Sequence, residues 1–231
     1  MEFHGINKTT LLDYPKHIAC TVFTGRCNLR CPFCHNADLV LQPDSQPFIT
    51  EEAIISFLSR RKDTLEGICI TGGEPTLQKD LLQFLSHCKE LGYLTKLDTN
   101  GTRPDVIKAA LDENLLDYIA MDIKNSPARY AETVGLSSIR FSAFEESAEL
   151  IKSCGLPYEF RTTVVKEFHT KEDFLAIGQW LKGAKCYALQ AFKDSGNLIQ
   201  PGLSGYGRDE LSAFAELLRP YFDEVLLRGT D

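Results

Sequence analysis

Three cysteines lie close together in the sequence, at Cys27, Cys31 and Cys34, with the spacing Cys-x3-Cys-x2-Cys. Thiolates at this spacing can converge on an iron–sulfur cluster, because the iron atoms of such clusters take soft sulfur ligands. A [4Fe–4S] cluster has four irons, so three cysteines leave one iron open to a small molecule. A zinc site is the alternative, since zinc takes four ligands and His35 directly follows Cys34.

The other five cysteines are scattered and form no second Cys-x2-Cys pair; they are Cys20, Cys69, Cys88, Cys154 and Cys186. Most of them lie in apolar segments, so we expect them to be buried free thiols rather than disulfides. The sequence therefore predicts a single cluster.

Short apolar segments that alternate with amphipathic stretches predict a parallel β-sheet covered by helices. We expect strands at 17–23, 67–71, 94–99, 118–123, 158–165, 186–192 and 224–227. Apolar stripes and capping signals predict helices after Thr50, around 81–88, from Pro104, after Thr170 and around 211–218.

A closed eightfold barrel typically takes about 250 residues. The chain has 231 residues, and its first predicted strand begins only at residue 17. These lengths favour an α/β fold that is an incomplete, TIM-like (β/α)6 barrel, with a flavodoxin-like doubly wound sheet as the alternative. We expect one domain over residues 1–231, with an N-terminal extension at 1–16 and a cluster loop at 24–36.

Polar residues and glycines gather where the predicted strands end. The cysteine loop follows the first strand, and the others are followed or closed by Thr71–Pro75, Asp98–Gly101, Asp122–Lys124, Arg161 and Gln190. Chemistry in parallel α/β folds collects at the carboxyl ends of the strands. We therefore expect all six groups to meet at one rim of the barrel.

The composition limits the class of protein. Hydrophobic residues make up 43% of the chain and charged residues 25%, with a formal net charge of −7, which is ordinary for a globular protein. The acidic balance argues against a nucleic-acid partner and against electrostatic attachment to a membrane. The sequence shows no apolar segment of membrane-spanning length and no signal-peptide pattern. We therefore expect a cytoplasmic protein.

The cysteine loop and the glycine turn that follows the second strand resemble the radical SAM superfamily. Phe33, the aromatic residue before the third cysteine, also matches its pattern. The resemblance implies one [4Fe–4S] cluster held by Cys27, Cys31 and Cys34, whose open iron binds S-adenosylmethionine. It also implies that the glycine turn, Gly72-Gly73-Glu74, holds the methionine ammonium, because residues without Cβ let carbonyls approach an amine. On its own this turn would indicate only a loop.

The sequences Asp98-Thr99-Asn100-Gly101 and Met121-Asp122-Ile123-Lys124 resemble a subset of that superfamily, the glycyl-radical-enzyme activating enzymes. The resemblance implies that Asp98, Thr99, Asn100, Asp122 and Lys124 help to bind S-adenosylmethionine, with a monovalent cation near Asp98 and Asp122. Without it, the first sequence would indicate a turn, and Asp122 with Lys124 a solvated pair.

Three further side chains are candidate cofactor ligands. Arg161 on an apolar strand is costly unless it is paired, either with the carboxylate of S-adenosylmethionine or with a core acid. His35, with Asn36, matches the Cys-His-Asn pattern of the activating enzymes; its ring could stack near adenine, contact a cluster sulfide or cap a helix. Gln190 is expected to contact the ribose.

Segments 8–15, 187–192 and 227–229 resemble the anaerobic ribonucleoside-triphosphate reductase activating protein family, and the resemblance covers essentially the whole chain. It implies an oxidoreductase that receives an electron from reduced flavodoxin or ferredoxin and cleaves S-adenosylmethionine to methionine and a 5′-deoxyadenosyl radical. That radical takes a hydrogen from a glycine Cα of a partner glycyl radical enzyme.

Two positions depart from the patterns of related activases. Gln190 stands where pyruvate formate-lyase activase has a histidine, which weakens an assignment to formate-lyase activation. Arg26 precedes Cys27, where the usual junction is Gly-Cys. The alternatives are a pyruvate formate-lyase-type activase, a radical SAM enzyme acting on a small molecule, and a non-enzymatic electron-transfer or metal-binding module.

Overall fold

The computed structural model describes residues 1–230, which form one nine-stranded sheet in the order β3-β1-β2-β4-β5-β6-β7-β8-β9. The strands are β1 (Glu2–Thr10), β2 (Ala19–Thr24), β3 (Ile49–Thr50), β4 (Gly67–Gly72), β5 (Leu94–Thr99), β6 (Tyr118–Asp122), β7 (Tyr158–Val164), β8 (Ala184–Ala191) and β9 (Phe222–Arg228). From β2 through β4 to β9 all strands are parallel, whereas β1 runs antiparallel to β2 and β3.

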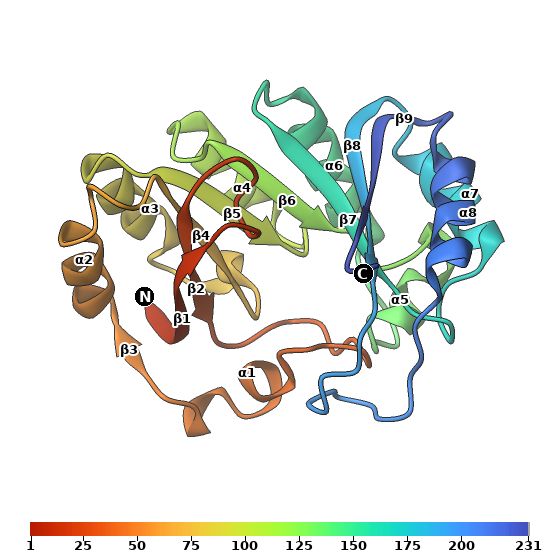
Figure 1. Cartoon of the computed structure of the whole chain (residues 1–231), viewed down its shortest axis with the longest axis horizontal. Coiled ribbons are helices and arrows are strands. Elements are labelled where there is room, and N and C mark those ends of the chain that lie inside the picture. The colour runs from red at the N-terminus through yellow and green to blue at the C-terminus, as the bar shows by residue number, and fades with distance from the viewer. Residues whose placement is uncertain (231) are drawn as a thin grey trace.

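The sheet curves without closing, and the helices lie along its outer side (Figure 1). The helices are α1 (Ala37–Leu41), α2 (Glu51–Ser59), α3 (Leu81–Glu90), α4 (Pro104–Asp112), α5 (Tyr130–Thr133), α6 (Phe141–Ser153), α7 (Lys171–Trp180) and α8 (Arg208–Leu218). The predicted incomplete TIM-like barrel is thereby confirmed, with β9 as an additional parallel edge strand. No helix among the described residues has the length and apolar character needed to cross a membrane.

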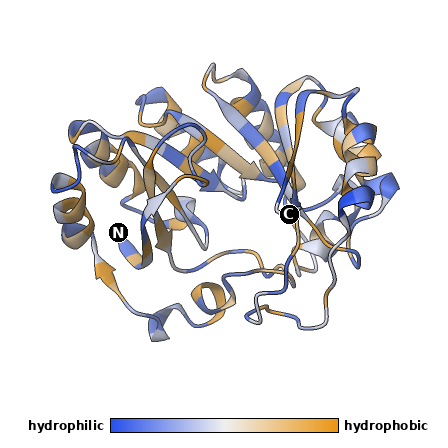
Figure 2. Ribbon diagram, in the orientation of Figure 1, coloured by the Kyte–Doolittle hydropathy of each residue, from blue (hydrophilic) through white to orange (hydrophobic). Residues whose placement is uncertain are grey.

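The two faces of the sheet differ in character because successive side chains in a strand point to opposite sides. Residues such as Ile68, Ile70, Leu97 and Ile119 are fully buried in the hydrophobic core. Alternate positions on the same strands carry polar and charged side chains that face the inside of the barrel. Figure 2 shows hydrophobic residues concentrated along the central strands and interspersed with polar residues along the outer helices.

Local sequence signals account for most of the helices. The Thr50 hydroxyl accepts a hydrogen bond from Ala53 N (3.2 Å) and caps α2. The predicted capping box of α7 is present, with Thr170 and Asp173 bonded reciprocally. Pro104 occupies the first turn of α4, where its missing N–H costs nothing.

Several elements were not predicted: β1, the short β3, and helices α1, α5 and α6. β1 lies inside the predicted N-terminal extension and pairs along one edge of β2. The loop after β1 turns under the barrel, where the Tyr14 ring packs against Tyr118 with centroids 5.9 Å apart. The division of the chain into one domain, extension and cluster loop stays a prediction.

The five scattered cysteines are free thiols. Cys20, Cys69 and Cys88 are fully buried as predicted, but Cys154 and Cys186 are only half-buried. Cys154 lies at the carboxyl end of α6, and Cys186 faces the barrel interior next to the edge strand β9, so neither is covered on all sides.

Candidate active site

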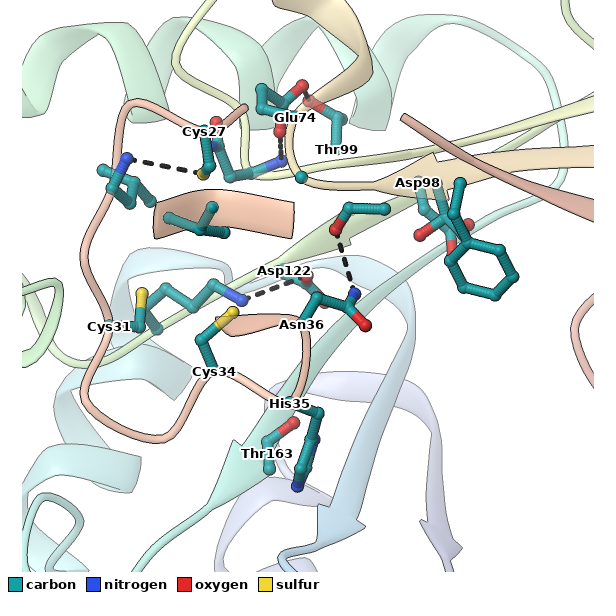
Figure 3. A pocket seen from close by; sticks show the side chains of 18 of the residues that line it. Cys27, Cys31, Cys34, His35, Asn36, Glu74, Asp98, Thr99, Asp122 and Thr163 are labelled. Carbon is teal, nitrogen blue, oxygen red and sulfur yellow. Dashed lines mark hydrogen bonds and ion pairs between the residues drawn. The ribbon is translucent and has the colours of Figure 1, made fainter. Parts of the chain in front are cut away.

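The cysteine loop and the carboxyl ends of the parallel strands enclose one cavity of about 400 Å³. Figure 3 shows the three cysteine side chains at this cavity, with Glu74 and Thr99 on one side and His35 on the other. Every predicted site residue lines it: Cys27, Cys31, Phe33, Cys34, His35, Gly72, Gly73, Glu74, Asp98, Thr99, Asn100, Asp122, Lys124, Arg161 and Gln190. The structure therefore brings the predicted groups together at one rim.

The cysteine loop is fastened by backbone hydrogen bonds to segments that are distant in the sequence. These bonds are Arg30 N to Val134 O (2.9 Å), Glu74 N to Arg26 O (2.8 Å) and Gln200 N to Pro32 O (2.9 Å). Arg26 itself has a φ of +68°, a left-handed conformation that is uncommon for residues other than glycine. The loop thus has a defined shape that depends on its neighbours.

The three thiols fit an iron–sulfur cluster. Burial raises the pKa of Cys27 to about 11, that of Cys31 to about 12, and also that of Cys34. Iron must therefore displace their protons when it binds. Cys27 Sγ accepts hydrogen bonds from Leu29 N (3.4 Å) and Asn100 Nδ2 (3.7 Å), which suit a metal-bound thiolate.

The zinc alternative requires several ligands around one ion. Among residues 1–230, no three His, Cys, Asp or Glu side chains are arranged to hold a single metal ion. His35, the proposed fourth ligand, instead places its Nε2 2.8 Å from Lys193 O and stacks on Phe192 with centroids 5.5 Å apart. The structure therefore gives no support to a zinc site in this loop.

The glycine turn packs directly against the cysteine loop. A Cβ on Gly73 would lie 1.9 Å from Arg26 O, and one on Gly72 would lie 2.4 Å from Thr24 N and O. Gly72 also has a φ of +115°. Both glycines are thus required by the fold of this chain itself, in addition to any role at an amine.

Glu74 organises the turn from within. Its side chain is 1% exposed, and its carboxylate accepts from Thr76 N (3.1 Å), Thr76 Oγ1 (2.6 Å), Thr99 Oγ1 (2.8 Å) and Asn100 N (2.6 Å). Burial raises the pKa of Glu74, and these hydrogen bonds oppose the rise. Because Asn100 in turn donates to Cys27 Sγ, Glu74 connects the glycine turn to a cluster ligand.

Charged side chains from three neighbouring strands form ion pairs at the cavity. Arg161 on β7 binds Asp98 on β5 through Nη2 (2.9 Å) and Asp122 on β6 through Nε (2.6 Å). Lys124 Nζ lies 3.0 Å from the second oxygen of Asp122. Burial disfavours the charge on Asp122, but Arg161 and Lys124 outweigh it and hold the pKa of Asp122 below its usual range.

Of the two partners predicted for Arg161, the structure shows the core acids, Asp98 and Asp122. Phe33 is buried and packs against Phe168, with ring centroids 5.6 Å apart. Gln190 on β8 lies in register with Thr163 on β7, and both line the cavity.

Two residues of functional interest were missed from the sequence. Lys96 is 1% exposed and lies inside the barrel, two positions before Asp98; the two-residue period of strands could have revealed it. Asp13 lines the cavity and accepts a hydrogen bond from Thr21 Oγ1 (2.6 Å). No local signal identifies Asp13, because its position depends on how the loop after β1 folds under the barrel.

Comparison with known proteins agrees with the fold. The model of the radical SAM superfamily matches residues 21–181, and the chain belongs to this superfamily. A Methanocaldococcus jannaschii protein provisionally named a glycyl-radical enzyme activating enzyme is 33% identical over 97% of this chain and 94% of its own length.

Other relatives share part of the molecule. The PqqA peptide cyclase of Methylocella silvestris is 29% identical over 58% of this chain and 36% of the cyclase. The structure of Streptococcus suis SuiB bound to S-adenosylmethionine has a TM-score of 0.71 and 16% identity, covering 89% of this chain and 49% of SuiB. At that identity the likeness shows the fold alone.

Proposed function

We propose that this protein is a radical SAM activase that generates the glycyl radical of a partner enzyme, with anaerobic ribonucleoside-triphosphate reductase as that partner. The observation that carries the proposal is the match to the Methanocaldococcus jannaschii protein, because it extends over 97% of the chain. Segments 8–15, 187–192 and 227–229 support the reductase partner by their resemblance to its activating proteins.

In this proposal Cys27, Cys31 and Cys34 hold one [4Fe–4S] cluster. When bound, the cluster and S-adenosylmethionine supply one-electron cleavage of the sulfonium C–S bond, which creates the species that abstracts hydrogen. Asn100 donates to the Cys27 thiolate, and the buried thiol of Cys31 is kept from solvent by the loop around it. Reduced flavodoxin or ferredoxin supplies the electron in this proposal, and the reaction takes place in the cytoplasm.

The remaining cavity residues bind and orient S-adenosylmethionine. The glycine turn at 72–74 lines the cavity, where the Gly72 carbonyl accepts a hydrogen bond from Asn36 Nδ2 (3.0 Å), and Lys124 places an ammonium beside Cys31 and Cys34. Phe33 and His35 bound the cluster side, while Gln190 with Thr163 offers polar groups on the opposite strands. Asp98, Thr99, Asn100, Asp122 and Arg161 form the connected wall between these two sides.

A second candidate is a radical SAM enzyme that modifies a free small molecule or a peptide. The partial similarity to PqqA peptide cyclases favours it. The segment 192–207 also favours it, because Gln200 N within this segment donates to Pro32 O of the cysteine loop (2.9 Å), and Asn197 Nδ2 donates to Asp38 Oδ2 of the adjoining α1 (2.9 Å). Such a segment is able to cover a bound substrate without any contribution from a partner.

The experiment that separates the two is anaerobic reconstitution followed by EPR. Mixed with reductant, S-adenosylmethionine and the anaerobic reductase of the same genome, the protein should produce a glycyl radical doublet. The Cys31→Ala variant should bind no cluster and give no doublet, whereas Cys154→Ala, at a half-buried cysteine outside the cavity, should behave as wild type. Cleavage of S-adenosylmethionine without a doublet on any glycyl enzyme of that genome would refute the activase proposal.

A further inference from the structure

Lys96 is a buried cation inside the barrel that the proposed function does not use. Its ammonium pairs with Asp98 Oδ1, lies 3.7 Å from Cys69 Sγ and sits 5.6 Å from the centroid of the Tyr118 ring. Burial disfavours its charge, but Asp98 outweighs that effect and the pKa of Lys96 is raised. Lys96 is therefore a permanent positive charge beneath the cavity.

The two carboxylates above it are fully paired. Asp98 uses one oxygen for Lys96 and the other for Arg161 Nη2 (2.9 Å), while Asp122 uses one for Arg161 Nε (2.6 Å) and the other for Lys124 Nζ (3.0 Å). The five side chains form a row of alternating sign from β5 to the end of β6. Arg161 also lies 4.0 Å from Glu159, which pairs with Arg228 (2.6 Å). With these two included, four cations face three anions, so the network carries a net positive charge.

The monovalent cation predicted near Asp98 and Asp122 does not fit this arrangement. An alkali ion binds to oxygen atoms, and each of the four carboxylate oxygens already contacts a protein cation. An added ion would meet a positive row in a partly buried site, where charges interact more strongly than in water. It would have to share these oxygens with a protein cation at close range or displace a buried ion pair, and both are costly.

We propose that Lys96 and Arg161 are built-in counterions that replace an alkali ion at this site, so that binding of S-adenosylmethionine is independent of sodium and potassium. Lys96 is then a positioning residue, which acts through Asp98. The identity of the ligand, S-adenosylmethionine, rests on the proposed function. The replacement of an alkali ion by protein cations does not, because it concerns the protein without its ligand.

The first test uses wild-type protein at one ionic strength in KCl, NaCl or tetramethylammonium chloride. The affinity of the cluster-loaded protein for S-adenosylmethionine, read from the change in the cluster EPR signal, should agree within about twofold among the three salts. Thermal unfolding of the cluster-free protein should also be unchanged among them. A gain in affinity of about tenfold or more in either alkali salt, or an alkali-specific rise in melting temperature, would overturn the inference.

The second test creates the missing site. Lys96→Ala frees one oxygen of Asp98 and leaves space beside it, so in tetramethylammonium chloride its affinity for S-adenosylmethionine should fall by about tenfold or more. Potassium or sodium should restore part of that loss. Lys96→Met fills the space without a charge, so its affinity for S-adenosylmethionine should fall and should not be restored by potassium or sodium. Lys96→Arg should retain the wild-type affinity.

Lys182→Ala, at an exposed lysine, is the matched control and should match wild type in every salt. Wild-type affinity of Lys96→Ala in tetramethylammonium chloride would refute the role of Lys96. The cluster-free melting experiment needs neither cluster, S-adenosylmethionine nor a glycyl enzyme. Its outcome therefore stands even if the activase proposal fails.

Discussion

Replacing Gly73 with alanine tests whether the glycine turn serves the cysteine loop or only a bound ligand. The new Cβ would lie 1.9 Å from Arg26 O, whereas carbon atoms in ordinary contact stay about 3.5 Å from their neighbours. The obstructing atom belongs to the backbone, so no side-chain rotation can relieve the overlap. The loop would have to move by roughly 1.5 Å, which weakens the bond from Glu74 N to Arg26 O.

The expected cost follows from these two effects. Overpacking typically costs 1–3 kcal/mol, and loss of a buried hydrogen bond adds about 1 kcal/mol or more. We expect Gly73→Ala to destabilise the cluster-free protein by about 2–4 kcal/mol, which for a chain of this size corresponds to a fall in Tm of roughly 10 °C. Cluster incorporation should fall as well, because the displaced loop carries the cysteines.

The assay is thermal unfolding of the cluster-free protein by circular dichroism, followed by iron and sulfide analysis after reconstitution. Gly207→Ala is the control, because its Cβ would meet no atom closer than 3.6 Å and its φ is −72°; it should cost under about 1 kcal/mol. If Gly73→Ala melts like wild type and loses only affinity for S-adenosylmethionine, the packing argument is wrong.

Three further predictions follow from the hydrogen bonds and charges of the site. Glu74→Gln should lower the free energy of unfolding in urea by about 2–3 kcal/mol. In either orientation the new amide NH2 would face a backbone N–H, that of Thr76 or that of Asn100, in place of an acceptor oxygen. The control Glu145→Gln, at an exposed position, should cost almost nothing. Arg161→Lys should lose about 3 kcal/mol or more, because one ammonium cannot replace both Nε and Nη2; an unchanged urea midpoint would contradict the pairing. The pKa values of Asp98 and Asp122 are lowered, so their stabilisation is complete above about pH 5 and is lost as pH falls below about 4. Asp122→Asn should flatten this acid limb of the stability curve, and an equally steep limb in the variant would count against the assignment.

The strands were the most predictable part of the fold. The prediction at 67–71 falls within β4 (Gly67–Gly72), because buried parallel strands are short apolar segments bounded by turns. β1 escaped prediction because only Phe3 and Thr10 within it are buried, so its apolar pattern is weak and its pairing with β2 defines it. α6 has a usable signal, because Phe144, Ala148 and Ile151 lie on one buried face, although this helix was not predicted.

The candidate site divides in the same way. Which residues gather at the cavity could be predicted, because parallel strands align their carboxyl ends and each motif follows one of them. Which atoms pair could not be predicted, because Arg161 meets Asp98 and Asp122 only across strand registers that the sequence does not specify. The contact of Gly73 with Arg26 O was hidden for the same reason, since it joins the ends of β2 and β4.

The row of charges and the cysteine loop belong to one electrostatic design. Burial makes each thiol costly to ionise, and the Lys124 ammonium is the nearby positive charge that opposes this cost at Cys27, Cys31 and Cys34. Lys124 can keep its charge in a partly buried place only because Asp122 pairs with it, and Asp122 is in turn shared with Arg161. Lys96 lies at the far end of the same row, so we expect a change there to be felt at Lys124 through Asp98, Arg161 and Asp122.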